Sequence, residues 1–256
     1  MTMLIYFVSL LCILRLHCVS SICLNYFVDL GSNIGIQCRK LFEPSLFPDA
    51  PLLPLFDKWF GPPLQRRQHT CSIGFEANPT HTARLRMLAS HLARLGANAT
   101  FHTAVVAGTV DRDNVTFFID PDAAHQSWGS SVLGRKTFAE HALVHERDIR
   151  PLMRSLKQGN AQGKVVVKMD VEGYEYVLMP ALLRAGLLCA DVIDVITLNG
   201  TRKRLYKSKA LRNFSAVLQR SCARSRVVRP RSWISTTRRI WLIHIRYSST
   251  KKQSCS

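Results

Sequence analysis

Residues 26–35, YFVDLGSNIG, restrict the folds open to this chain more than any other stretch. Their first half is a short apolar run of β-favouring residues, which is typical of a strand buried on both faces of a parallel sheet. Gly31 and Gly35 follow, where the chain must turn sharply into a helix and where a ligand can approach the backbone. Asp29 lies beside that turn at the carboxyl end of the strand, which in an open α/β sheet faces the ligand-binding crevice.

The spacing of the glycines is neither that of a phosphate-binding loop nor that of a dinucleotide fingerprint. An acid followed by G-x-N-x-G is similar instead to motif I of methyltransferases that use S-adenosylmethionine. In those enzymes the glycines pass close to the methionine part of the cofactor, and the acid receives its ammonium group directly or through water. An ordinary strand, turn and helix without a ligand is the alternative that this motif alone leaves open.

A second acid follows the next predicted strand. Residues 71–75, CSIGF, form that strand, and Glu76 ends it. A carboxylate at this point can accept both hydroxyl groups of a ribose. Between the two strands lies a proline-rich insertion, residues 44–68, whose proline density predicts no regular helix. We expect it to be ordered and to pack its aromatic side chains on the domain, either over the cofactor entrance or as a surface loop without a catalytic role.

Three acids cluster after a further buried strand. In residues 164–175, KVVVKMDVEGYE, Asp170, Glu172 and Glu175 follow an apolar run. An acidic helix start, stabilised by the helix dipole, explains Glu172 and Glu175. It does not explain why Lys168 and Asp170 interrupt a strand that should be apolar, so we favour a functional role at the crevice.

The rest of the chain predicts alternating strands and helices. Helices are expected at 80–95, 138–157, 176–185 and 202–222, and strands at 101–107, 115–119, 192–198 and 240–245. The helix at 138–157 would carry His141, His145 and Glu146 on its surface, without the spacing of a metal site. Residues 121–137 form a loop whose Trp128 either lines a substrate cleft or is an ordinary exposed side chain.

Three stretches together resemble the FkbM family of methyltransferases. They are FVDLGSNIG (27–35), GFEANP (74–79) and VVKMDVEGYEYVLMPALL (166–183), in the order of the family. The K-x-D-x-E-G-x-E pattern of the last stretch is the most specific part. The resemblance implies a Rossmann-like α/β methyltransferase fold, with a mostly parallel central sheet and helices on both faces. It also implies methyl transfer from S-adenosyl-L-methionine, usually to a hydroxyl oxygen of a sugar or natural product.

The same resemblance implies roles for single residues. The methionine end of the cofactor would be lined by Asp29, Gly31, Asn33 and Gly35. Glu76 would bind the ribose, and Asp170 and Glu172 would lie near the transferred methyl group or the acceptor.

The formal net charge of +18 is concentrated at one end of the chain. Residues 201–256 hold 16 of the 35 Lys and Arg residues and none of the 17 acids, so residues 1–200 are nearly neutral. Fold arguments therefore set the basicity aside. We expect a methyltransferase domain over 24–200 and a basic extension over 201–256, which either partly completes the sheet or is disordered.

The eight cysteines are scattered, so the sequence predicts neither a zinc site nor a disulfide framework. In the N-terminal segment 1–23, residues 3–14 form an apolar run. This run is either a signal anchor in a secretory-pathway membrane or a leading helix of a cytoplasmic protein. Four Asn-x-Ser/Thr sequons begin at Asn98, Asn114, Asn199 and Asn213.

The favoured interpretation is an S-adenosylmethionine-dependent O-methyltransferase acting on a hydroxyl of a sugar, a glycan or another small molecule. The sequence indicates no metal-ligating residues, and metal dependence is left open. Asp170 or Glu172 would take the acceptor proton or orient the acceptor. One alternative is an RNA-directed methyltransferase that uses residues 201–256 as an electrostatic platform for nucleic acid. Another is a non-enzymatic relative that serves as an interaction module. The oligomeric state is left open.

Overall fold

The computed structural model describes residues 23–134, 138–158, 162–189, 192–199, 225–234 and 239–247. The apolar run at 3–14 and the predicted helix at 202–222 lie outside these ranges. Within them, no helix combines the length and the apolar character that crossing a bilayer requires.

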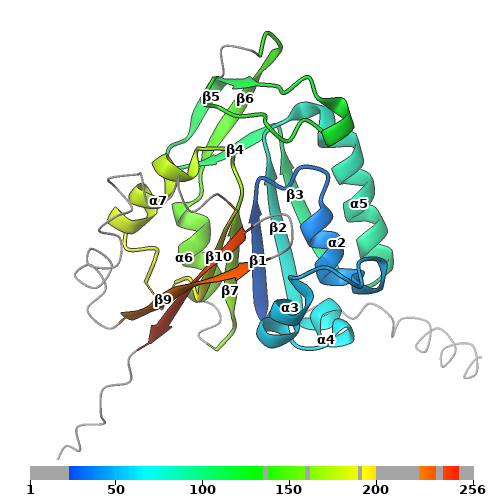
Figure 1. The fold of residues 1–256 in the computed structure, drawn as a ribbon, viewed down its shortest axis with the longest axis vertical. Helices are drawn as coiled ribbons and strands as arrows, with labels where there is room; N and C mark the ends of the chain where they lie inside the picture. Colours follow the sequence, from blue (N-terminus) through cyan, green and yellow to red (C-terminus); the bar gives the residue numbers. More distant parts are fainter. Residues whose placement is uncertain are drawn as a thin grey trace, which may run out of the picture.

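A seven-stranded sheet forms the centre of the molecule (Figure 1). In spatial order its strands are β3 (Asn98–Thr103), β2 (Thr70–Glu76), β1 (Asn25–Leu30), β7 (Val165–Met169), β8 (Val195–Asn199), β10 (Arg239–Tyr247) and β9 (Ser225–Ile234). The first five are parallel, and β10 runs antiparallel to both of its neighbours. This is the strand order of the Rossmann-like methyltransferase fold, so the predicted fold class is confirmed. The strand predicted at 240–245 is β10, and it forms a hairpin with β9.

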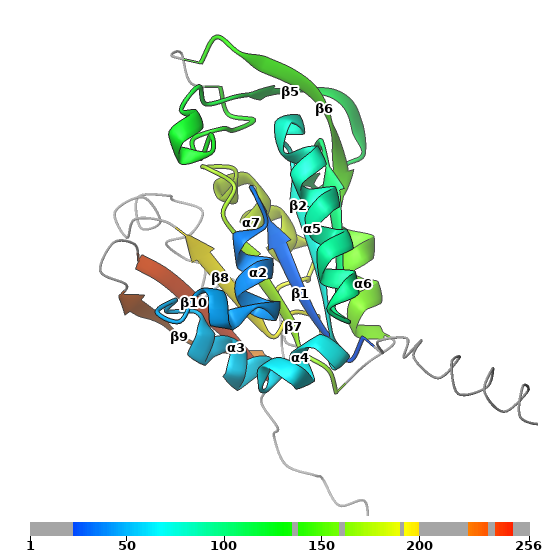
Figure 2. The same cartoon turned by 90° about the vertical axis from the view of Figure 1, so that its right-hand side faces the viewer.

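Helices cover both faces of the sheet because its central strands are apolar on both sides. On one face, Val28, Leu30 and Met169 pack with α6 (Arg150–Gln158) and α7 (Glu175–Arg184). On the other face, Phe27 and Val166 pack with α2 (Ile36–Phe42), α3 (Leu53–Phe60) and α5 (Thr82–Arg94). Figure 2 shows α2, α3 and α5 on the second face. The alternation of Phe27 and Val28 between the two cores follows from the two-residue period of a strand.

The proline-rich insertion contains regular helices, contrary to the prediction. After a short 3-10 helix at Pro44–Leu46, the chain forms α3 and α4 (Pro63–His69). Pro54 and Pro63 each occupy the first turn of a helix, where the missing N–H has no intrahelical acceptor to lose. The aromatic side chains of α3 are buried, as expected, and the Phe56 ring packs edge-on against Phe27 at 5.3 Å between ring centroids.

A second, three-stranded sheet forms the upper end of the molecule in Figure 1 and replaces the first part of the helix predicted at 138–157. Its order is β4 (Val105–Gly108), β6 (His141–Asp148) and β5 (Arg112–Phe118), and α6 begins only after β6. Exposure alternates along β6, with Val144 and Glu146 buried. The prediction that Glu146 lies on the surface is therefore wrong.

The cysteines also differ from expectation, because Cys23 and Cys71 form a disulfide. The bond ties the start of β1 to the neighbouring strand β2 across 48 positions of sequence. Nothing in the spacing of the cysteines indicates this pair, because the register of two parallel strands creates it.

Candidate functional site

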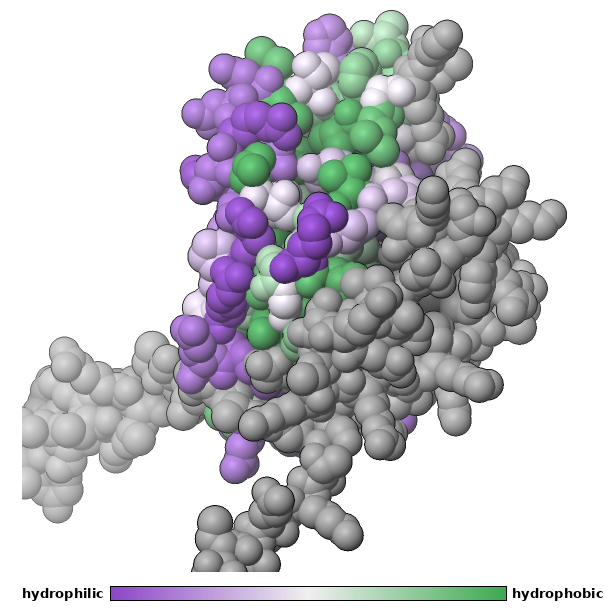
Figure 3. All heavy atoms as spheres, turned by 90° about the vertical axis from the view of Figure 1, so that its left-hand side faces the viewer, coloured by the Kyte–Doolittle hydropathy of each residue, from purple (hydrophilic) through white to green (hydrophobic). Residues whose placement is uncertain are grey.

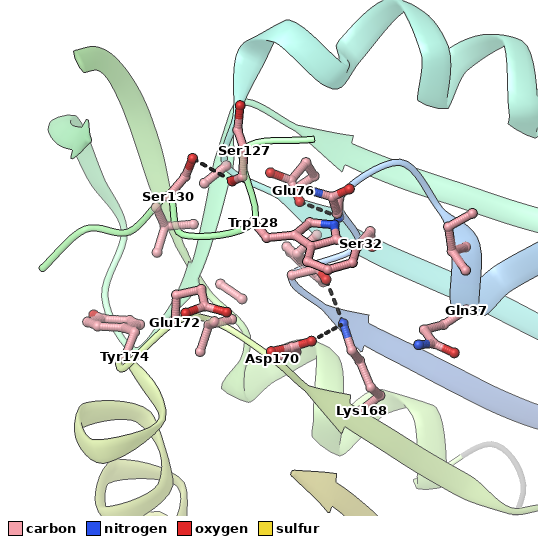
Figure 4. A pocket seen from close by; sticks show the side chains of 18 of the residues that line it. Ser32, Gln37, Glu76, Ser127, Trp128, Ser130, Lys168, Asp170, Glu172 and Tyr174 are labelled. Atoms are coloured by element: carbon pink, nitrogen blue, oxygen red, sulfur yellow. Dashed lines mark hydrogen bonds and ion pairs between the residues drawn. The ribbon is translucent and has the colours of Figure 1, made fainter. Parts of the chain in front are cut away.

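A cavity of about 440 Å³ lies at the carboxyl ends of β1, β2 and β7, where the small sheet approaches the central one. Its walls come from the turn after β1, from α2, from the ends of β2 and β7, and from residues 127–132 (Figure 4). In the sheet order, β1 stands between β2 and β7, so this edge is the topological switch point at which open α/β sheets bind ligands. The volume falls within the range of small-molecule sites.

The turn after β1 is held tightly against its neighbours. The backbone N–H groups of Gly31 and Ser32 both donate to the Phe75 carbonyl oxygen, at 3.0 and 2.9 Å. Gly31 has a φ of +80°, and a Cβ built there would lie 2.0 Å from the Asp170 carbonyl oxygen. Only glycine therefore fits between β1 and the end of β7. Gly31 lines the cavity.

Gly35 has a different position from the one expected. It is not among the lining residues, and a Cβ there would meet Leu88 and Leu85 of α5 at 2.3 and 3.2 Å. Its role in this structure is to let α2 begin close to α5. The expectation that it lies at the methionine end of a cofactor is corrected.

Asp29 also faces inward rather than into the cavity. In the parallel register, Asp29 of β1 stands directly beside Lys168 of β7, and the Lys168 Nζ atom lies 3.0 Å from Asp29 Oδ1. The Asp29 side chain is completely buried and does not line the cavity, whereas Lys168 does. This pair explains why a lysine interrupts an apolar strand. It also means that Asp29 already holds a cation supplied by the protein.

Burial raises the pKa of Asp29, and the charge of Lys168 opposes that effect. For Lys168, burial lowers the pKa, but the carboxylates of Asp29 and Asp170 outweigh it and the net shift is upward. Lys168 Nζ also donates to the Gly31 carbonyl oxygen at 2.6 Å. The lysine thus fixes the turn after β1 as well as neutralising the acid.

Glu76 lines the cavity at the end of β2, where the sequence places it. Its two oxygens accept hydrogen bonds from the backbone N–H groups of Asn33, at 2.5 Å, and Asn78, at 2.8 Å. Burial nonetheless raises its pKa to about 7. Each carboxylate oxygen has a second lone pair, so both can still accept a ligand hydroxyl.

Asp170 and Glu172 line the cavity beyond β7 (Figure 4). Asp170 Oδ2 lies 3.7 Å from Lys168 Nζ. Glu172 has a φ of +47°, which is an unfavourable backbone conformation for a residue other than glycine and is typical of functional sites. The hydroxyl of Ser131, which donates to the Glu172 carbonyl oxygen at 3.0 Å, helps to hold this conformation. Glu175, by contrast, turns back to accept from the N–H groups of Val171 and Gly173.

The loop before β6 closes the opposite wall of the cavity. Ser127, Trp128 and Ser130 line it there (Figure 4), and that this wall binds a substrate stays a prediction. Asn33 holds this loop against the turn after β1, because its side-chain amide donates a hydrogen bond to the Gln126 carbonyl oxygen at 2.8 Å. Asn33 thus links the turn after β1, the end of β2 and the loop.

Among the polar lining residues that the sequence analysis does not identify are Gln37 and Lys40 on α2 and Thr197 on β8. Gln37 and Lys40 are three positions apart, so they lie on one face of α2 directly after the glycine turn, and this spacing is a signal that identifies them. Gln37 Oε1 and Thr197 Oγ1 are buried at the wall and have no hydrogen-bond partner within the part of the chain that the structure describes. Burial and the charge of Lys168 lower the pKa of Lys40.

No protein-family model matches the chain, and no curated protein is significantly similar to it. Among solved structures, a Streptococcus pneumoniae protein assigned as a tRNA (m1A22) methyltransferase, in complex with S-adenosyl-L-methionine, is similar with a TM-score of 0.36 and 12% identity. That alignment covers 93% of this chain and 72% of the other.

A precorrin-6y C5,15-methyltransferase from Geobacter metallireducens gives a TM-score of 0.35 and 11% identity over 90% of this chain and 83% of the other. LepI in complex with S-adenosylmethionine gives a TM-score of 0.34 and 9% identity, over 91% of this chain and 46% of the other. At scores this low, the fold assignment rests on the strand order and register of the sheet.

Proposed function

We propose that the chain is a methyltransferase of the FkbM type that uses S-adenosyl-L-methionine and methylates a hydroxyl group of a sugar or another small molecule. The observation that carries the proposal is one cavity at the switch point of the sheet, into which the glycine turn, Glu76, Asp170 and Glu172 all converge. These groups come from three separate strand ends, so their meeting at one place supports a ligand site more strongly than any single motif.

The residues present fit the cofactor. Glu76 offers two oxygens to the ribose hydroxyls, and Lys40 offers a cation to the carboxylate of the methionine part. Phe75 and Val106 provide apolar wall for the adenine. Asp29 already forms an ion pair with Lys168. We therefore assign the ammonium group of the cofactor to Asp170, which lies on the other side of that lysine and lines the cavity.

When bound, the cofactor supplies a methyl carbon made electrophilic by a sulfonium. The protein must then align an acceptor oxygen with that carbon, because an in-line displacement depends mainly on orientation. We assign to Glu172, whose backbone carbonyl accepts a hydrogen bond from Ser131, the roles of orienting an acceptor hydroxyl and of taking its proton as a general base. Ser127 lines the cavity, and its hydroxyl can donate to another oxygen of a polar acceptor, whereas the Ser130 hydroxyl already donates to the Ser127 carbonyl oxygen at 2.8 Å.

The proposal is tested by isothermal titration of the full chain with S-adenosylmethionine and S-adenosylhomocysteine. We expect binding by the unaltered protein and by Glu172→Gln, and much weaker binding by Glu76→Gln and Asp170→Asn. Asp113→Asn is the matched control, because the Asp113 side chain is 78% exposed and does not line the cavity.

Absence of binding by a folded protein would contradict the proposal. Binding by the Asp170 variant as tight as by the control would reject the assignment of the ammonium group alone. The RNA-directed alternative depends on residues 201–256, and no observation on the described part of the chain favours it.

A further inference from the structure

We propose that Asn114 is a glycosylation site that carries an N-linked glycan. The site is independent of the cavity and of the proposed methyl transfer. Of the four sequons, two lie on residues whose side chains the structure describes, Asn98 and Asn114. Their surroundings differ in the properties that decide whether an asparagine can carry a large polar group.

Asn114 lies at an irregularity in an outer strand of the small sheet. The register between β5 and β6 shifts between Arg112 and Val115, so Asp113 and Asn114 together lie opposite the single residue His145 and β5 bulges there by one residue. Asn114 has a φ of +57° and is exposed. Asparagine tolerates this left-handed conformation better than most residues, which makes it a natural occupant of such a bulge.

The surroundings of Asn114 are polar and open. Asp113 on one side pairs with His145 at 2.6 Å, and both side chains are more than half exposed. Thr116, the hydroxyl residue of the sequon, is exposed as well. Within the described residues no hydrogen bond uses the Asn114 amide, so attaching a sugar there disrupts no described contact. Figure 3 shows hydrophilic side chains at the margin of this upper end of the molecule, beside apolar ones.

Asn98 has the opposite character. It begins β3 of the central sheet, is partly buried, and pairs in register with Cys71. Its side-chain Nδ2 atom donates to Cys23 Sγ at 3.7 Å. A glycan on that nitrogen would crowd the disulfide that ties β1 to β2.

The proposal also requires that the chain folds in an oxidising compartment, and the disulfide supports this. Disulfides persist in oxidising compartments such as the endoplasmic reticulum and are rare in the cytosol. Cys71 is buried in β2, so the Cys23–Cys71 bond belongs to the folded core rather than to an exposed, exchangeable site. N-linked glycosylation takes place in the same oxidising lumen, and it requires a sequon on the surface.

The modification is a transfer of an oligosaccharide from a lipid diphosphate donor by the transferase of that compartment. A bond forms between Asn114 Nδ2 and the anomeric carbon of the first sugar, and the bond from that carbon to the diphosphate oxygen breaks. The amide gives up one proton, and the lipid diphosphate leaves with the electron pair.

The test is expression of the full chain in cultured animal cells, followed by glycosidase release in ¹⁸O-labelled water and mass spectrometry of the peptide that contains Asn114. We expect the asparagine to be converted to labelled aspartate in the unaltered protein. Thr116→Ala should abolish the label, whereas Thr116→Ser, which keeps the sequon, should retain it. Asn98→Gln should leave the label at position 114 unchanged.

The proposal is overturned if the Asn114 peptide remains unmodified while the Cys23–Cys71 disulfide is found in the same sample. It is equally overturned if the protein stays reduced and unmodified in the cytosol. Persistence of the label in Thr116→Ala would show that the modification does not depend on the sequon, which also refutes it.

Discussion

Replacement of Lys168 by methionine tests the central feature of the site, the charge pair between β1 and β7. The substitution keeps the length and apolar stem of the side chain but removes the cation that lies 3.0 Å from Asp29. Asp29 would then be a fully buried carboxylate whose described ion-pair partner is gone. The carbonyl of Gly31 would lose its hydrogen bond from the lysine as well.

The size of the effect follows from the geometry. At 3.0 Å and an effective dielectric constant of about 20, the attraction between two unit charges is about 5 kcal/mol. Removing one partner of a buried pair costs about 3–5 kcal/mol, because the remaining charge is left desolvated. Protonation limits that cost, since burial already raises the pKa of Asp29. We therefore expect Lys168→Met to lower the free energy of unfolding by about 3–5 kcal/mol.

Urea unfolding followed by tryptophan fluorescence measures this loss. Lys164→Met is the matched control on the same stretch, because Lys164 is half exposed and its partner Asp194 also pairs with Lys157. Its loss should be about 0–1 kcal/mol. Adding Asp29→Asn to Lys168→Met should recover a large part of the stability, because no buried charge remains. Equal losses for the two lysine variants would refute the reasoning.

Three further predictions concern Gly31 in the turn after β1, Glu76 at the end of β2, and the disulfide. Gly31→Ala should lower the free energy of unfolding, measured in urea, by clearly more than Gly96→Ala. Gly96 has a similar φ of +77° but open space around it, so its replacement should cost about 1–2 kcal/mol. Equal costs would show that the contact with Asp170 does not limit the side chain at position 31. The pKa of Glu76 is raised to about 7, and in our proposal its ionised form accepts the ribose hydroxyls. Cofactor affinity measured by titration should therefore be about tenfold weaker at about pH 6 than at about pH 8, and Glu76→Gln should abolish that dependence. The double variant Cys23→Ser/Cys71→Ser opens a loop of 48 positions and should lose about 4 kcal/mol of stability, whereas replacing the buried free thiol with Cys38→Ala should leave the disulfide in place on a non-reducing gel.

The strand ends could be read from the sequence because each is a local pattern, an apolar run followed by an acid. Asp170 and Glu76 were placed at the crevice on that basis, and both line the cavity. The partner of Asp29 could not be read in the same way. It depends on the register between β1 and β7, which are about 140 positions apart and become neighbours only when the sheet forms. Lys168 was visible as an anomaly, but not as the cation of a particular acid.

The errors in secondary structure have local causes. His141 and His145 are four positions apart, a spacing that fits one face of a helix and equally one face of a strand. Residues 141–148 form a strand because they pair with β4 on one side and β5 on the other. In the insertion, proline density alone suggested loop, but the positions of the prolines matter more than their number. Those at the start of α3 and α4 favour helix formation.

The acids of the site fall into two groups once their contacts are known. Asp29 is held by Lys168, and Glu175 accepts from backbone amides of its own loop, so both stabilise the walls of the cavity. Glu76, Asp170 and Glu172 line its interior. Loss of activity in an Asp29 variant would therefore be a consequence of a displaced lysine and turn, and it would not show contact with a cofactor. A Glu172 variant that binds cofactor normally but transfers no methyl group would, in contrast, report on the reaction itself, because normal cofactor binding would show that the cavity is intact.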